Sequence, residues 1–210
     1  MTHLRVLVAY LLLFSVLYAA FGVQSPFLPS LLQEHGLSPE AIGIVLAAGT
    51  AIRLLAGPAA GWLADRLNAP KLVFAGCAVV AATAVLGYLP ATGLPSLLAV
   101  TLLQASALAP LAPLGDALVL SAAAPRSRGN RSGFDYGWAR GTGSAAFILG
   151  SIMSGQVVEH YGLAAIVWLN PALLALTAML APRVPLGQWV SLTPIADRRS
   201  IDEIPAISFL

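Results

Sequence analysis

Charged side chains are scarce in this sequence: Asp, Glu, Lys and Arg together make up 10% of its 210 residues. A soluble domain carries about 25% charged and roughly 45–50% apolar residues, whereas 58% of this chain is hydrophobic. One soluble core cannot bury that excess. A lipid bilayer can accommodate it, and each spanning helix needs about 20 apolar residues. The composition therefore predicts an all-α membrane protein that contacts the lipid bilayer.

Other scarce or missing features exclude several kinds of function. A single cysteine, Cys77, excludes an intrachain disulfide and a cysteine-rich metal site. The formal net charge of +2 gives no support to nucleic-acid binding. The sequence has no G-x-x-x-x-G-K-[ST] phosphate-binding loop, so nothing supports a function driven by ATP. It has no metal-ligand or nucleophile motif either, and we expect no catalytic residue, metal or cofactor.

Six apolar stretches of near-spanning length predict a bundle of six transmembrane helices with short links. They cover residues 6–24, 41–63, 72–89, 96–124, 134–158 and 163–180. The second has a clear helix start, because Ser38 is a favourable N-cap and is followed by Pro39 and Glu40. The first could also be a cleaved secretory signal, since His3 and Arg5 precede its apolar run. The five later stretches predict a membrane protein in either case.

The distribution of basic residues predicts the orientation. Six alternating spans place nine of them in loops on one side: Arg5, Arg66, Lys71, Arg126, Arg128, Arg131, Arg183, Arg198 and Arg199. The opposite loops contain no Lys or Arg and hold Glu34, His35, Glu40, Glu159 and His160. Cytoplasmic loops are enriched in Lys and Arg. We therefore expect both termini to be cytoplasmic, with the bundle in the cell (inner or plasma) membrane.

Three charged residues fall well inside the predicted spans: Arg53, Asp116 and Arg140. A rise of 1.5 Å per residue places them about 13–18 Å from the cytoplasmic edge, near the middle of a hydrocarbon core about 30 Å thick. Charges at this depth usually face a bundle interior or a water-filled cavity. We expect one shared polar site in which Asp116 and Arg140 pair. The alternative is that these charges only lock helix packing.

Neighbouring side chains suggest what else such a site contains. On the fifth span, Ser144 and Phe147 recur with Arg140 at helical spacing. On the first span, an aromatic stripe is formed by Tyr10, Phe14, Tyr18 and Phe21. Its rings could stack on an aromatic ligand or face the lipid. Close helix contacts are predicted where glycines lie four residues apart, at Gly57 and Gly61 and at Gly133, Gly137 and Gly141.

Proline pairs interrupt two of the predicted spans. Pro26 and Pro29 lie in the far half of the first, and Pro110 and Pro113 in the far half of the fourth. Interrupted segments at corresponding places in two repeats point to a transport site. Spans one to three and four to six enter from opposite sides, as a 3+3 inverted repeat requires. We expect residues 1–182 to form one six-helix unit and residues 183–210 to form a polar cytoplasmic linker or tail.

The segment Gly61-Trp62-Leu63-Ala64-Asp65-Arg66-Leu67, between the second and third spans, resembles the G-x-L-A-D-R loop signature of the major facilitator superfamily. The resemblance implies that a cytoplasmic gate is formed by Gly61, Asp65, Arg66 and Lys71. The usual glycine after the motif is replaced by Asn68, which tolerates a left-handed backbone. The usual second arginine of the signature is absent.

Residues 112–117 and 134–140 resemble the lactose permease and phenylpropionate permease branch of that superfamily. The resemblance implies that Asp116 and Arg140 pair and bind substrate. Phe147 stands where the lactose permease has a sugar-stacking tryptophan, and residues 27–29 and 36–43 are more similar to phenylpropionate permeases. Members have twelve spans in two halves, so this chain is expected to be the N-terminal half, ending before the second. To form a complete twelve-span transporter, it would need that second six-helix half or a second copy of itself.

These features together predict a secondary active transporter of a small organic solute that works by alternating access. Proton symport of an aromatic carboxylate is favoured, with substrate-binding residues Arg53, Asp116, Arg140, Ser144, Phe147 and Tyr18. A sugar or nucleoside symporter remains open, as does an inactive half-transporter or membrane scaffold. A membrane enzyme is disfavoured, because its polar residues would cluster at one interface rather than at mid-depth.

Overall fold

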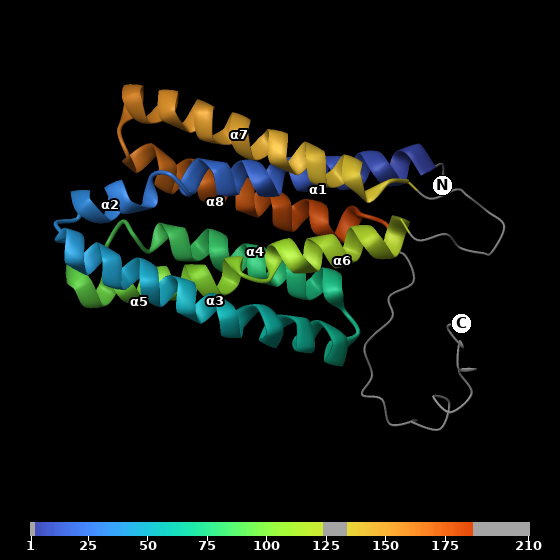
Figure 1. Cartoon of the computed structure of the whole chain (residues 1–210), viewed down its shortest axis with the longest axis horizontal. Helices are drawn as coiled ribbons and strands as arrows, with labels where there is room; N and C mark the ends of the chain where they lie inside the picture. The colour runs from blue at the N-terminus through green and yellow to red at the C-terminus, as the bar shows by residue number, and fades with distance from the viewer. Residues whose placement is uncertain (1–2, 124–133, 187–210) are drawn as a thin grey trace, which may run out of the picture.

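The computed structural model describes residues 3–123 and 134–186, and within them the regular structure is helical, without strands. The helices lie side by side in one elongated bundle (Figure 1). Several residues of the sequence predictions lie outside these described ranges: Arg126, Arg128, Arg131, Gly133, Arg198 and Arg199.

Each predicted apolar stretch coincides with one helix or with a pair of consecutive helices. In chain order these are α1 (His3–Gln24), α2 (Leu28–Glu34), α3 (Pro39–Leu67), α4 (Pro70–Leu86), α5 (Gly93–Leu108), α6 (Leu111–Ala123), α7 (Tyr136–Tyr161), α8 (Ala164–Leu180) and the 3-10 helix η1 (Ala181–Arg183). The first and sixth stretches end at the predicted residues, Gln24 and Leu180, and the other boundaries differ by a few residues.

The two predicted interruptions are present. α1 stops at Gln24, just before Pro26, and α2 resumes beyond it. α5 stops at Leu108, and α6 begins directly after Pro110. Proline has no backbone N–H and its ring clashes with the preceding turn, which explains why both helices stop there.

Two of the helix ends follow from single residues. The Ser38 hydroxyl accepts a hydrogen bond from the backbone N–H of Ala41 at 3.3 Å, which confirms Ser38 as the N-cap of α3. At the other end of α3, Asn68 adopts φ 49° and ψ 36°, the left-handed conformation that was expected from its position after the loop motif.

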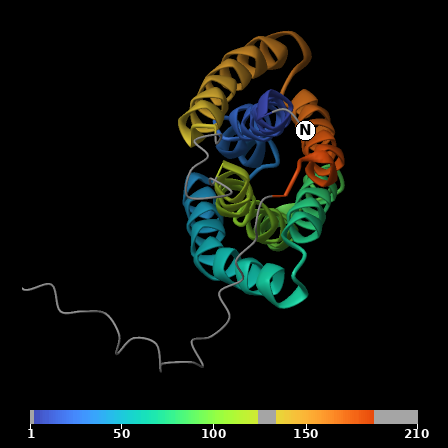
Figure 2. The same ribbon diagram turned by 90° about the vertical axis from the view of Figure 1, so that its right-hand side faces the viewer.

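α1 lies in the interior of the bundle, between α7 and α8, as the end-on view shows (Figure 2). Its side chains Tyr10, Leu13, Phe14 and Leu17 are fully buried. α3 packs mainly on α5, and α4 packs on both α8 and α5. The Tyr10 hydroxyl lies within hydrogen-bonding distance of two main-chain carbonyls, at 3.0 Å from Leu118 and 2.8 Å from Pro185.

The closest helix approach joins α1 and α7. A Cβ atom added at Gly150 would lie 2.7 Å from the Ala19 carbonyl oxygen, and one added at Gly143 would lie 2.8 Å from the Tyr18 ring. Three of the glycines predicted from their four-residue spacing do not have this role within the described residues: a Cβ at Gly57, Gly61 or Gly141 would meet nothing within 4 Å. For these three the prediction was wrong, because spacing fixes which residues share a face, but not which face meets a neighbour.

Four helical segments within the described residues are long and apolar enough to cross a membrane: Leu4–Gln24, Pro39–Leu67, Gly93–Ala123 and Ala164–Arg183. α4 is apolar but shorter, with 17 residues. α7 has 26 residues, which is a sufficient length, but it is not among these four. The all-α membrane class is therefore confirmed, and six spans remain a prediction.

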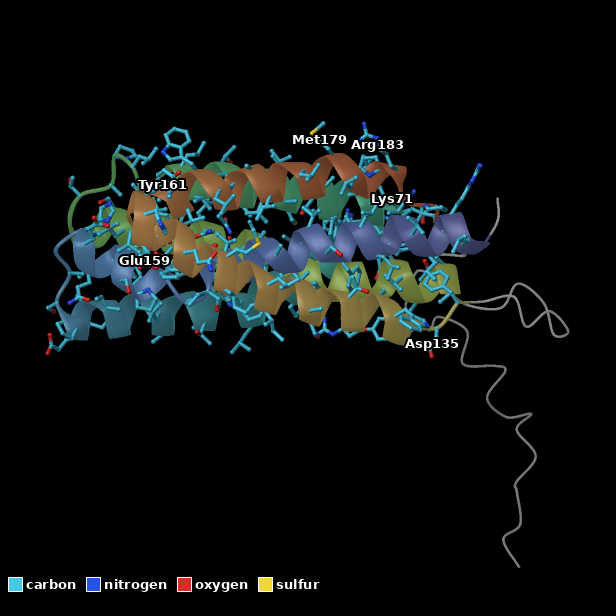
Figure 3. All side chains as sticks on the ribbon, turned by 90° about the horizontal axis from the view of Figure 1, so that it is seen from above. Lys71, Asp135, Glu159, Tyr161, Met179 and Arg183 are labelled. Atoms are coloured by element: carbon cyan, nitrogen blue, oxygen red, sulfur yellow. The ribbon has the colours of Figure 1, made fainter. Side chains whose placement is uncertain are left out.

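The two ends of the bundle differ in charge. Lys71 and Arg183 lie at one end, whereas Glu159 and Tyr161 lie towards the other (Figure 3). We call the first the basic end, defined by Arg66, Lys71 and Arg183, and the second the acidic end, defined by Glu34, Glu40 and Glu159.

Candidate functional site

A cavity of about 530 Å³ is lined by residues from both interrupted helix pairs and from α3 and α7. Its wall consists of Phe21, Gln24, Ser25, Leu28, Leu46, Gly49, Thr50, Arg53, Thr101, Ala105, Leu108, Ala109, Ala112 and Phe147. Ser25 and Leu28 flank the break between α1 and α2, and Ala109 and Ala112 flank that between α5 and α6. The two proline interruptions therefore border one common space.

The charged group in this cavity wall belongs to Arg53 of α3. The rings of Phe21 and Phe147 come from α1 and α7, and small or aliphatic side chains make up much of the remaining wall. A guanidinium is a fixed positive charge with several N–H donors suited to a carboxylate, and aromatic rings offer faces on which another ring can stack. The wall thus has the chemistry to hold an anion attached to an apolar or aromatic body.

A second group of predicted site residues meets beside this cavity. Asp116 Oδ1 lies 3.8 Å from Arg140 Nη1. The same Arg140 nitrogen donates a hydrogen bond to the Tyr18 hydroxyl, and its guanidinium carbon lies 5.0 Å from the centre of the Tyr18 ring. The predicted contact between Asp116 and Arg140 is therefore present, but as one ion pair and not as a bidentate one. Asp116 Oδ1 is buried and has no hydrogen-bond partner in the described structure.

This pair and the cavity are neighbours along the bundle. Asp116 follows the lining residue Ala112 by four residues on α6, a separation of about 6 Å along the helix axis. The Tyr18 and Phe21 rings lie 5.5 Å apart, edge to face, and Phe21 lines the cavity. Arg53 is in the cavity wall and is not part of the Asp116 ion pair.

The remaining predicted residues occupy different environments. Phe147 lines the cavity, whereas the Ser144 hydroxyl is exposed and donates to the Arg140 carbonyl of its own helix at 3.2 Å. Tyr10, Phe14 and Tyr18 of the aromatic stripe are buried inside the bundle, so a lipid-facing position is wrong for these three. Helical periodicity placed them on one face, and the packing of α7 and α8 around α1 covered it.

The residues of the predicted cytoplasmic gate lie at the basic end. The Arg66 guanidinium lies 5.0 Å from the centre of the Trp62 ring, and the Lys71 ammonium donates to the Val184 carbonyl beyond η1. Gly61 faces open space, and Asp65 has no ion-pair partner within residues 3–123 and 134–186. Lys71 thus joins the start of α4 to the segment that follows η1.

A buried network of uncharged polar groups was missed by the sequence analysis. Gln24 and Gln104 exchange two hydrogen bonds, at 2.8 and 2.7 Å. The Tyr88 hydroxyl lies 3.1 Å from Gln104 Oε1 and 3.0 Å from Thr101 Oγ1. The available signal was two glutamines inside or at the end of apolar stretches, where a polar side chain needs a partner.

Comparison with known proteins gives two matches. The profile of the MFS_1 like family matches residues 5–199. Over 173 residues, or 80% of this chain, the sequence is 27% identical to a protein of Escherichia coli (strain K12) named "Probable 3-phenylpropionic acid transporter". This match spans 43% of the relative's length, so the chain covers less than half of that protein.

Proposed function

We propose, since this chain belongs to the MFS_1 like family of major facilitator proteins, that it forms one half of a secondary transporter for a small organic solute. The membership confirms the resemblance predicted from the loop motif and from the segments around Asp116 and Arg140. We further propose that the solute is an aromatic carboxylate, that it enters together with a proton, and that it binds in the cavity between the interrupted helices.

The cavity wall is the observation that carries this proposal. It combines one guanidinium, from Arg53, with the rings of Phe21 and Phe147 in a space of about 530 Å³. The carboxylate would bind Arg53, and the ring would lie against the two phenylalanines. The substrate in the name of the similar Escherichia coli protein has both a carboxylate and an aromatic ring. The Asp116–Arg140 pair lies one turn away, where it would hold Tyr18 against the substrate-facing Phe21.

The packing of the helices supports an inverted repeat of three spans each. α1 packs on α7 and α8, and α5 packs on α3 and α4. If α1 with α2 corresponds to α5 with α6, α3 to α7 and α4 to α8, these two sets of contacts are equivalent. Exchanging the two repeats then exchanges α4 with α8, so the contact between these two helices is the same in both repeats. Such repeats place the substrate between interrupted helices and alternate access by rocking.

The orientation and the partner belong to the same proposal. The basic end carries Arg66, Lys71 and Arg183 and would face the cytoplasm, with both termini, in the inner or plasma membrane. A second six-helix unit, from a second half or a second copy, would close the cavity. Exposed apolar side chains on α3 that such a unit could cover are Ile44, Leu54 and Leu55.

Ligand binding to the purified chain in lipid nanodiscs tests the site. We expect 3-phenylpropionate to bind, and Arg53→Gln to weaken its binding at least tenfold, because the charge-assisted contact to the carboxylate is lost. Binding of the uncharged 3-phenylpropionamide should change less than twofold. Arg66→Gln is the matched control, since Arg66 stacks on Trp62 at the basic end and is not in the cavity wall.

Two outcomes would contradict the proposal. If Arg53→Gln and Arg66→Gln weaken 3-phenylpropionate binding equally, the cavity is not the carboxylate site. If the acid and the amide bind equally well to the unaltered chain, the substrate is not recognised as an anion. A neutral solute such as a sugar would then be the better candidate.

A further inference from the structure

We infer that Gln104 and Tyr88 are positioning residues, which hold the Gln24 carboxamide and the Thr101 hydroxyl in the cavity wall so that the site binds a substrate carrying a hydroxyl group at the end opposite its carboxylate. This inference rests on the proposed function, since it assumes that an aromatic carboxylate occupies the cavity.

The hydrogen-bond capacity of Gln24 is the first step. A carboxamide has two N–H donors and an oxygen with two lone pairs. The reciprocal bonds to Gln104 use one N–H and one lone pair of Gln24, which leaves one of each. Gln24 is 8% exposed and lines the cavity, so a ligand there is within reach of the groups that remain. A polar group this deeply buried is normally satisfied by a partner.

The second step is that Gln104 and Tyr88 determine where Gln24 and Thr101 point. Gln104 is 2% exposed and Tyr88 is 1% exposed, and neither belongs to the cavity wall. Gln104 Oε1 lies within hydrogen-bonding distance of both Gln24 Nε2 and the Tyr88 hydroxyl. The contact between Gln104 and Gln24 joins α5 to α1. Tyr88 is itself anchored at its carbonyl, which lies 3.0 Å from His35 Nε2.

The number of hydroxyl protons available shows how Thr101 takes part in the same hydrogen-bond network. The Thr101 hydroxyl has one proton and lies 2.8 Å from the Leu97 carbonyl of its own helix. When it donates there, its oxygen accepts either from a ligand or from the Tyr88 hydroxyl, whose single proton otherwise goes to Gln104 Oε1. Thr101 is 3% exposed and lines the cavity, so its free lone pair complements the remaining N–H of Gln24. A hydroxyl group, which both donates and accepts, is the substituent that suits this pair.

The third step is the position of Gln24 and Thr101, the polar residues of the cavity wall, relative to Arg53. A Cβ atom at Gly49 would lie 3.5 Å from the Thr101 methyl carbon, so Gly49 and Thr101 are at the same level of the bundle. Arg53 follows Gly49 by one helical turn, about 6 Å further towards the basic end. Gln24 and Ser25 lie at the end of α1 nearest the acidic end. A carboxylate on Arg53 would thus direct the far end of the ring towards Gln24 and Thr101.

The test compares two ligands that differ by one oxygen atom, 3-phenylpropionate and 3-(4-hydroxyphenyl)propionate, in binding to the full chain in nanodiscs. We expect the hydroxylated acid to bind the unaltered chain at least fivefold more tightly. Tyr88→Phe and Gln104→Leu should each abolish most of that preference. Their binding of 3-phenylpropionate should change less than twofold, which also reports that these variants are folded.

Thr83→Val is the matched control, because the Thr83 hydroxyl is exposed on α4 and bonds only to carbonyls of its own helix in the described structure. It should leave the preference intact. If Tyr88→Phe and Gln104→Leu weaken both ligands equally, the network is structural and the inference is overturned. The same holds if the unaltered chain binds both acids equally. Failure of the proposed function is distinct, because Arg53→Gln would then leave the binding of both acids unchanged.

Discussion

Arg140 of α7 contacts two partners at once, the Asp116 carboxylate of α6 and the Tyr18 ring and hydroxyl of α1. The side chains of Arg140 and Asp116 are 46% and 29% exposed. Exposed ion pairs contribute little to stability, whereas removal of one partner from a buried pair leaves a charge without compensation. At this intermediate exposure, the cost of breaking the pair should be measurable but modest.

A double-mutant cycle at this pair separates the contact from its surroundings. Asp116→Asn and Arg140→Gln should each destabilise the protein, and the double variant should be more stable than the sum of the two effects implies. We expect a coupling energy of about 1 kcal/mol, in the lower part of the range for contacting residues. Unfolding midpoints in detergent measure it. Strict additivity of the two single effects would mean that the ion pair does not exist in the folded protein.

At the scale of helices, the contact between α1 and α7 depends on glycines that the sequence pattern did not single out. Gly150 of α7 meets the backbone of α1 at Ala19, and Ser151 donates to the Gly22 carbonyl at 3.0 Å. Backbones approach this closely only where no Cβ intervenes. The interface positions α7, and with it both Arg140 and the cavity residue Phe147.

Two glycine substitutions should therefore change the stability of the protein in opposite directions. Gly150→Ala places a methyl group 2.7 Å from the Ala19 carbonyl oxygen and should cost about 1–3 kcal/mol, as overpacking does. Gly57→Ala meets nothing within 4 Å and should stabilise α3 by up to about 1 kcal/mol through helix propensity. Thermal unfolding of both variants checks this. Equal destabilisation would show that Gly57 is also a contact residue in the assembled protein.

At the scale of the whole molecule, the proposed orientation in the membrane rests on the charge difference between the two ends. Glu40 and Leu67 lie at opposite ends of α3 and are both exposed. The chain has a single cysteine, Cys77, so a variant with Cys77→Ser has no cysteine that could react.

In that background, Glu40→Cys should react with a membrane-impermeant maleimide added to intact cells, because the proposed orientation places the acidic end outside. Leu67→Cys should react only after the membrane is permeabilised. Mass shifts on a gel report both reactions. The opposite pattern would invert the proposed topology, and labelling of both positions from outside would show that α3 does not cross the membrane.

Much of the candidate site was accessible from the sequence, but not its arrangement. Arg53, Asp116 and Arg140 were recognisable because charges are rare in apolar spans. The structure brings Asp116 and Arg140 together and places Arg53 in the cavity wall beside them. The partners Gln104 and Tyr88 were not recognisable, because uncharged polar residues are tolerated at many positions in a helix and only neighbours reveal which of them meet.

The helical class, the helix order, the breaks at Pro26 and Pro110 and the caps at Ser38 and Asn68 could all be predicted from the amino-acid sequence. These depend on local backbone chemistry and on the apolar character of each stretch. Helix packing was needed to show which glycines meet a backbone, that the α1 aromatic stripe is covered, and that Gln24 pairs with Gln104 across 80 residues. Those outcomes depend on how each helix is rotated against its neighbours. Spacing along one helix does not specify that rotation.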